Sequence, residues 1–93
     1  MRLRLTADAA SDLESIKRFS EDIDAALAAR IIDQIGRLLS LLKHYPRIGH
    51  DGVLPGTFEM LVPRLPIVIV FRIDAGDREE LVVLRVYHTR QQR

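Results

Sequence analysis

The fold is decided by the segment VPRLPIVIVFRI at residues 62–73 and by the segment LVVLRVYHTR at residues 81–90. Residues 67–73 are apolar on both faces until Arg72, which is typical of a strand in the middle of a sheet. The polar residues 74–80 predict a hairpin turn, and residues 81–87 predict a second buried strand. The second segment ends in a small cluster of His and Arg, where we expect any functional chemistry of this chain.

Composition indicates one folded domain that spans residues 1–93. The chain has 47% hydrophobic residues and no cysteine, so wholesale disorder, disulfides and thiolate sites are excluded. Fourteen Lys and Arg against thirteen Asp and Glu leave a net charge of +1, below that expected of a dedicated nucleic-acid binder. No run approaches the ~18 apolar residues of a membrane span, and residues 1–14 lack an export signal. We therefore expect a cytoplasmic protein.

Two helices are predicted before these strands. Residues 2–6 alternate like a short strand, and Thr6 is a suitable N-cap for the first helix. That helix is expected to end near Glu21. Its apolar face consists of Ala9, Leu13, Ile16 and either Phe19 or Ser20.

The second helix carries the clearest periodicity in the chain. Asp22 or Asp24 is its expected cap, and Pro46 is expected to end it. Gly36 within the helix costs about 1 kcal/mol relative to Ala, so we expect close approach of the first helix there. The stripe is formed by Leu27, Ile31, Ile35, Leu38 and Leu42.

The remaining segments complete the predicted order β-α-α-β-β-β. Residues 46–57 contain two Pro and three Gly and read as a loop, and residues 58–62 alternate as a strand. The last three strands form an antiparallel meander, and the strand at residues 2–6 joins one edge. The fold class is therefore α+β, with an N-terminal helical hairpin packed on an antiparallel sheet in two layers.

The sequence contains no standard cofactor-binding or metal-binding motif. Gly49, Gly52 and Gly56 lack the strand–loop–helix context of a phosphate-binding loop. His44 and His50 near Asp51 fit no metal-ligand spacing. We expect no cofactor and no metal.

Arginine residues in apolar strands leave two interpretations open. Arg72 and Arg85 could form ion pairs on the sheet, for example with Glu59, or could bind a carboxylate or phosphate. RNA cleavage would need a base, a cation and an acid. The base could be Glu59 or His88, the cation Arg64, Arg72 or Arg90, and the acid His88 or Tyr87. These residue types are common in small basic domains and do not specify that chemistry.

The chain resembles the RelE/ParE superfamily of type II toxin–antitoxin toxins over essentially its whole length. The resemblance lies in the order and spacing of several segments. These are Ala10-x-Asp12-Leu13-x-x-Ile16, Ala25-Ala26, Leu41-x-x-x-Tyr45-Pro46-x-x-Gly49, residues 65–73 and residues 84–90.

Within the superfamily, residues 65–73 and the ending His88-Thr89-Arg90 are similar to ParE. RelE-type ribosome-dependent nucleases place a catalytic Arg near the position of Val68, which has no group that could hold a phosphate. The resemblance implies a plasmid-stabilising, growth-inhibiting toxin that binds DNA gyrase without chemistry of its own. The alternatives are a RelE-type endonuclease, with Glu59, His88 and Arg90 as catalytic residues, and an inactive binding module.

The resemblance also implies a ParD-like antitoxin that forms a hetero-oligomer with this chain. We expect the antitoxin on the uncovered sheet face, at Val68, Val70, Arg72 and Arg85, because that face needs an apolar cover. Gyrase is expected to contact the C-terminal basic residues His88, Arg90 and Arg93, or the basic residues 43–50. DNA would be reached only through the antitoxin or gyrase.

Overall fold

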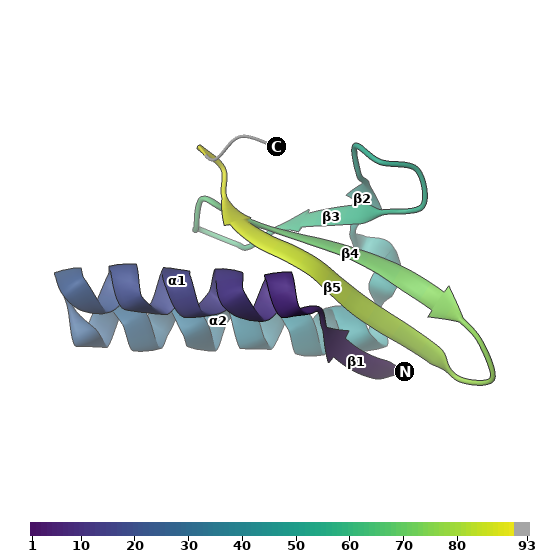
Figure 1. Cartoon of the computed structure of the whole chain (residues 1–93), viewed down its shortest axis with the longest axis horizontal. Helices are drawn as coiled ribbons and strands as arrows, with labels where there is room; N and C mark the ends of the chain where they lie inside the picture. Colours follow the sequence, from purple (N-terminus) through teal and green to yellow (C-terminus); the bar gives the residue numbers. More distant parts are fainter. Residues whose placement is uncertain (91–93) are drawn as a thin grey trace.

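The computed structural model describes residues 1–90 of the chain, arranged as two helices on one face of a five-stranded sheet (Figure 1). The predicted α+β class and the two-layer arrangement are confirmed. The elements are β1 (Arg2–Leu5), α1 (Ala7–Ile23), α2 (Ala25–His44), the 3-10 helix η1 (Pro46–Ile48), β2 (His50–Asp51), β3 (Phe58–Leu61), β4 (Ile67–Ala75) and β5 (Glu79–His88).

The sheet is mixed, whereas the sequence predicted an antiparallel one. The strand order is β1-β5-β4-β3-β2, and β1 runs parallel to β5 while the other neighbours are antiparallel. A parallel pair needs a long crossover between its strands, and here both helices and the meander lie between β1 and β5. The two-residue strand β2 was not predicted, because it is too short to show an alternating pattern.

Asp24 both ends α1 and begins α2, and so forms the turn of the helical hairpin. Its backbone N–H donates to Ser20 O at 2.9 Å, and its carboxylate accepts from Ala26 N–H at 3.0 Å. Asp24 rather than Asp22 is therefore the cap, and α1 extends two residues beyond the predicted Glu21 to Ile23. The predicted end of α2 before Pro46 is confirmed, since Pro46 begins η1.

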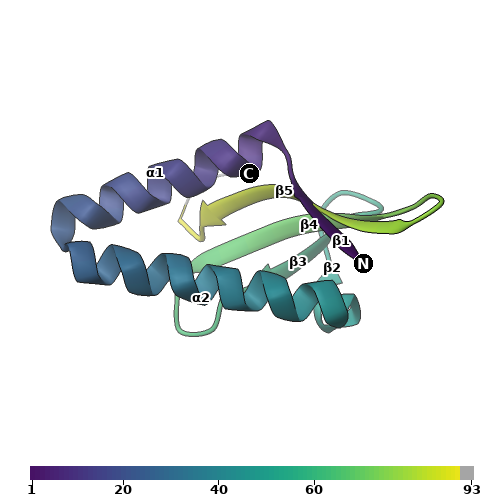
Figure 2. The same ribbon diagram turned by 90° about the horizontal axis from the view of Figure 1, so that it is seen from below.

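The core lies between the helices and one face of the sheet. Ile67, Ile69 and Phe71 of β4 pack into it with Ile35 and Leu42 of α2, as the two-face alternation of β4 predicted. Seen from below in Figure 2, the helical hairpin covers β3, β4 and β5. In both views the turn between α1 and α2 extends beyond the ends of the strands. That overhang leaves part of the apolar helix surface without a sheet partner.

The close helix approach expected at Gly36 is wrong. A Cβ atom at Gly36 would meet no atom within 4 Å, and the residue faces an open hollow between α1 and α2. Close approach occurs instead at Gly49, where a Cβ would lie 2.8 Å from Cζ of Phe71. Leu13 of α1 and Ile35 of α2 line this hollow together with Gly36.

Candidate protein-binding surfaces

An apolar groove lies where the overhanging helical hairpin meets the end of the sheet, with a volume of about 590 Å³. Phe19 and Ile23 on α1 are 70% and 63% exposed, an unusual degree for large apolar side chains in a helix that packs on a sheet. Ser20, not Phe19, takes the buried position and is 3% exposed. The helical wall of the groove is formed by Ile16, Phe19, Ile23, Leu27 and Ile31.

The opposite wall of the groove comes from the ends of β4 and β5. Leu65, Pro66 and Ile67 supply apolar surface, and His88 and Arg90 supply the polar groups. The end of β5 is fixed because Thr89 N–H donates to Pro66 O at 2.8 Å. Arg90 is the charged residue of the groove, and no acidic residue lines it within residues 1–90. The groove therefore suits an apolar segment that carries a carboxylate.

His88 has a defined orientation at the edge of this groove. The backbone N–H of Arg90 donates to His88 Nδ1 at 3.1 Å. Because a backbone N–H can only donate, Nδ1 is the acceptor and carries no proton in this arrangement. Two of the predicted target-binding residues, His88 and Arg90, thus lie together. The third, Arg93, lies outside the described residues.

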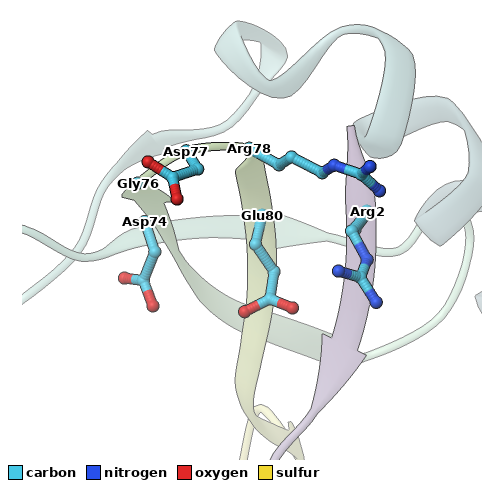
Figure 3. Close-up of a pocket in the computed structure, with 6 residues that line it drawn as sticks. All are labelled: Arg2, Asp74, Gly76, Asp77, Arg78 and Glu80. Atoms are coloured by element: carbon cyan, nitrogen blue, oxygen red, sulfur yellow. The ribbon is translucent and has the colours of Figure 1, made fainter.

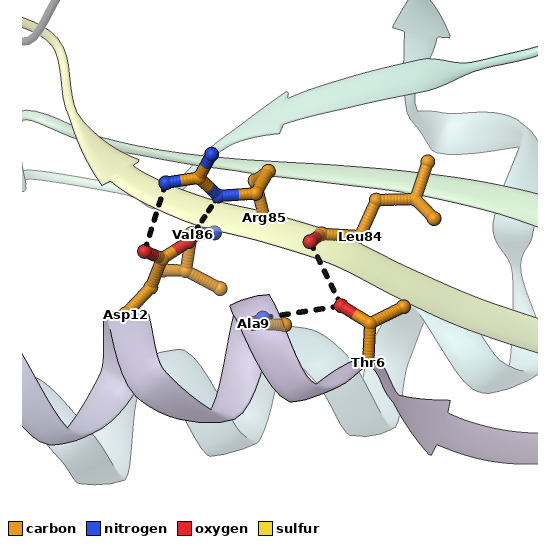
Figure 4. A network of polar contacts seen from close by, with 6 residues as sticks. All are labelled: Thr6, Ala9, Asp12, Leu84, Arg85 and Val86. Atoms are coloured by element: carbon orange, nitrogen blue, oxygen red, sulfur yellow. Dashed lines mark hydrogen bonds and ion pairs between the residues drawn. The ribbon is translucent and has the colours of Figure 1, made fainter.

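Arg85 is bound within the molecule, by α1. Its Nε and Nη2 donate to the two carboxylate oxygens of Asp12 at 2.7 and 3.0 Å, and Val86 N–H donates to the same carboxylate at 2.9 Å (Figure 4). The hydrogen bonds to Asp12 raise the pKa of Arg85, which therefore stays charged. The sequence suggested Glu59 as a partner for this arginine, and the structure places Asp12 there instead.

Thr6 continues the same contact between helix and strand. Val70 pairs with Arg85 and Phe71 with Val83, so Leu84 is the extra residue of a β-bulge. Thr6 Oγ donates to Leu84 O at 2.9 Å and accepts from Ala9 N–H at 3.1 Å (Figure 4). With Asp12, Thr6 satisfies backbone groups of β5 beyond the last residue of β1. This edge of β5 is therefore closed to pairing with another strand.

Arg72 also has a partner on its own strand. It donates to the carboxylate of Asp74 at 2.8 and 3.3 Å, which lowers the pKa of Asp74 and raises that of Arg72. The partner suggested by the sequence was Glu59, so this assignment is also corrected. Val68, on the same face of β4, is only 7% exposed. The uncovered face thus offers less apolar surface than its sequence suggests.

Glu59 and His88 are not brought together. Glu59 pairs with Val70 across β3 and β4, while His88 pairs with Ile67 across β4 and β5. Ile67 faces the helices and Val70 faces away from them, so the two side chains lie on opposite faces of the sheet. Glu59 is buried, and its carboxylate accepts from Val53 N–H at 3.3 Å, which anchors the loop before β3. Its position is that of a structural residue.

A second hollow, of about 420 Å³, lies at the far end of the β4–β5 hairpin beside β1. Figure 3 shows Arg2 and Arg78 on the β1 side and Asp74 and Asp77 on the other, with Glu80 between them. Three carboxylates and two guanidinium groups line this hollow, and two of the carboxylates already have partners, since Asp74 pairs with Arg72 and Glu80 with Arg4. In residues 1–90, no group of three or more His, Asp or Glu side chains could hold a metal ion. None of the described helices meets the length and hydrophobicity needed to cross a bilayer.

The groove was missed because helical spacing alone does not separate Phe19 from Ser20. Both fit the apolar face, so the sequence left open which of the two is buried. A signal was present in the run Ile16, Phe19, Ile23 and Leu27, which continues the apolar surface through the turn at Asp24. A hairpin that is apolar up to its tip needs a partner there.

Comparison with known proteins places this chain in a family. A sequence model of the ParE toxins of type II toxin–antitoxin systems (parDE) matches residues 3–93. A curated relative, the candidate toxin Y4kP of Sinorhizobium fredii, is 32% identical over 91 residues, which cover 98% of this chain and 91% of that protein.

Solved structures share the fold. A chain of the chromosomal ParDE system from P. aeruginosa superposes with a TM-score of 0.83 at 23% identity, covering 95% of both chains. The YoeB/ParE toxin from Agrobacterium tumefaciens gives 0.67 at 22% identity, covering 95% of this chain and 98% of its own. The toxin–antitoxin complex RelBE2 from Mycobacterium tuberculosis gives 0.66 at 26% identity, covering 94% and 95%.

Proposed function

Because this chain belongs to the ParE toxin family of type II toxin–antitoxin systems, we propose that it inhibits DNA gyrase by binding and that a ParD-like antitoxin neutralises it. The observation that carries the proposal is the match to the ParE toxin model over residues 3–93. The ParDE chain from P. aeruginosa supports it through the fold alone. We place the activity in the cytoplasm, where gyrase and chromosomal DNA are found.

The site geometry favours binding over RNA cleavage. Cleavage at a 2′-hydroxyl needs a base and an acid on either side of one phosphate. Glu59 is buried and lies on the opposite sheet face from His88, so these two groups do not surround a common point. Val68 stands where RelE-type nucleases carry an arginine. A ribosome-dependent endonuclease is the alternative, because the chain also shares its fold with the RelBE2 toxin–antitoxin complex.

The groove between the hairpin tip and the sheet end is our proposed anchor site for the antitoxin. Exposed apolar surface of this extent is stabilised by a partner, and an amphipathic helix could bury Phe19 and Ile23. Arg90 would pair with an antitoxin carboxylate at the edge of the groove. An extended arm could then cross the uncovered sheet face and contact Val68, Val70, Arg72 and Arg85.

Neutralisation would follow from shared residues. His88 and Arg90 line the groove and also belong to the proposed gyrase contact, together with Arg93. An antitoxin that fills the groove would cover the first two of these residues. Antitoxin and gyrase would therefore compete for one surface, and their binding would be mutually exclusive.

Plasmid supercoiling by purified gyrase, with and without the folded chain, tests the proposal. Lost supercoiling or trapped double-strand breaks, reversed by the antitoxin, would support gyrase as the target. The matched control is the same assay with the chain carrying His88→Ala and Arg90→Ala. If gyrase is unaffected while translation in a cell-free system stops, the endonuclease alternative gains support. If neither responds, an inactive binding module remains.

A further inference from the structure

A second exposed apolar surface lies at the other end of α2, around η1. Leu41, Tyr45 and Ile48 are 46%, 62% and 43% exposed. Leu41 and Tyr45 are four residues apart at the end of α2 and lie on one face of it, and Ile48 follows one turn later. Leu41 and Tyr45 belong to the segment that marked the family resemblance, and the core uses neither. Leu41, Tyr45 and Ile48 thus form an exposed apolar strip at this corner of the molecule.

Basic side chains surround the strip. Lys43, His44 and Arg47 are exposed, and the sequence contains no Asp or Glu from residue 34 to residue 50. Within residues 1–90, Lys43 and Arg47 form no ion pair, unlike Arg37 and Arg18, which pair with acids four residues away. His44 Nδ1 lies 2.9 Å from Ser40 O, so its ring is held against the helix end. Lys43 and Arg47 remain available to an acidic partner.

The corner is also preorganised. Tyr45 N–H donates to Leu41 O at 2.8 Å, and Ile48 N–H donates to Tyr45 O at 3.2 Å. The backbone of Gly49 packs against the ring of Phe71, since a Cβ at this position would lie 2.8 Å from Phe71 Cζ. That contact fixes η1 on the core. A surface that is rigid before binding loses less conformational entropy when it binds.

We propose that this corner is a second protein-docking surface, which binds an acidic amphipathic helix of a partner protein. Carboxylates of that helix would meet Lys43 and Arg47, and its apolar face would cover Leu41, Tyr45 and Ile48. Two of these three side chains are aliphatic and cannot stack on bases, so the chemistry favours protein over nucleic acid. Leu27 and Tyr45 are roughly 27 Å apart along α2, at about 1.5 Å per residue. The corner therefore stays open when the groove is filled.

The test needs neither gyrase nor antitoxin, so its outcome is independent of the proposed function. The isotopically labelled chain is titrated with a synthetic helical peptide that has a leucine face and glutamates elsewhere. Backbone amide chemical shifts are followed by residue. The same peptide with lysine replacing glutamate and a short DNA duplex are titrated in parallel. We expect the acidic peptide to shift residues 41–48 as a set, separately from any shifts in the groove at residues 16–31.

The double variant Lys43→Glu and Arg47→Glu should weaken that binding at least tenfold. Arg18→Glu with Arg37→Glu is the matched control, because it makes the same change in net charge at two other exposed helical sites and should leave binding unchanged. Two results of the titrations would overturn the proposal: no shift at residues 41–48 with the acidic peptide, or equal binding of the lysine peptide. Tighter binding of DNA at this corner would also overturn it. So would an equal loss of peptide affinity in both double variants. Amide spectra of each variant confirm that the fold is retained.

Discussion

Asp12 on α1 holds Arg85 on β5, with oxygen-to-nitrogen distances of 2.7 and 3.0 Å, at the point where β1 no longer covers the strand. The same carboxylate accepts Val86 N–H at 2.9 Å. A helix side chain thus takes over from a strand in satisfying the edge of the sheet. The arrangement joins the first half of α1 to the strand that ends at His88.

Replacing Asp12 should cost more stability than replacing Arg85. Asp12→Ala leaves Val86 N–H without its charged acceptor, which should cost about 2 kcal/mol of unfolding free energy. Arg85→Ala removes a half-exposed ion pair and should cost less than about 1 kcal/mol. Urea denaturation of both variants and of the double variant measures these values. Equal costs would mean that the ion pair, and not the amide bond, carries the stabilisation.

Gly36→Ala should stabilise the protein by about 1 kcal/mol. The position is helical, and the new methyl group would enter open space, so only the helix-propensity gain remains. Gly49→Ala is the contrasting variant and should destabilise, because its methyl group would meet Phe71 and the backbone oxygen of Glu59. Thermal unfolding of both proteins provides the comparison. A loss of stability in Gly36→Ala would show that the hollow between the helices is filled.

Phe19→Glu should weaken antitoxin binding more than tenfold while the unfolding free energy changes by less than about 0.5 kcal/mol. The side chain is 70% exposed, so the core does not depend on it. Leu54→Glu is the matched control, since Leu54 is 67% exposed and lies outside the groove. Calorimetric titration with the antitoxin measures the affinity of each variant. Equal effects of the two substitutions would remove the groove from the interface.

Phe19→Glu should also make the free chain more soluble. The sequence predicts that the toxin alone is poorly soluble because it exposes apolar surface, and the groove is one such surface. Light scattering of the two proteins at matched concentration measures the difference. A free wild-type chain that stays monomeric at high concentration would argue against an obligatory cover.

Removal of residues 90–93 should abolish gyrase inhibition and leave antitoxin binding within about threefold, since the apolar walls of the groove remain. Supercoiling assays and antitoxin titration on one protein preparation separate the two effects. Inhibition that survives the truncation would exclude Arg90 and Arg93 as the target contact. The basic corner at residues 43–50 would then be the next surface to test.

Asp74 should titrate below the ordinary aspartate value because Arg72 donates two hydrogen bonds to it. A depressed pKa in the folded state means that the stabilisation is complete above the ordinary aspartate pKa of 3.8 and is lost as pH falls through the lower pKa of the folded state. Carboxyl chemical shifts followed during acid titration measure this pKa. In Arg72→Gln it should return towards 3.8. An unchanged pKa would show that the ion pair does not form in solution.

The sequence alone was sufficient for the fold class and the family. The stripe of α2 follows the helix period, and Ile35, Leu38 and Leu42 of its five residues are buried. The run of β4 indicated a central strand because it is apolar on both faces. Pro46 ended a helix through its own ring geometry. Each of these features depends on residues that are close together in the sequence, so each can be predicted from the sequence alone.

Tertiary structure decided the rest, because the deciding partners are distant in sequence. Asp12 and Arg85 are 73 residues apart, and no local rule pairs them. Whether Phe19 or Ser20 faced the core depended on where the sheet ends beneath the hairpin, and whether Glu59 could reach His88 depended on strand register. A register fixes the face of every side chain at once. The groove exists because two helices outreach the strands they cover, a relation that appears only when both layers are in place.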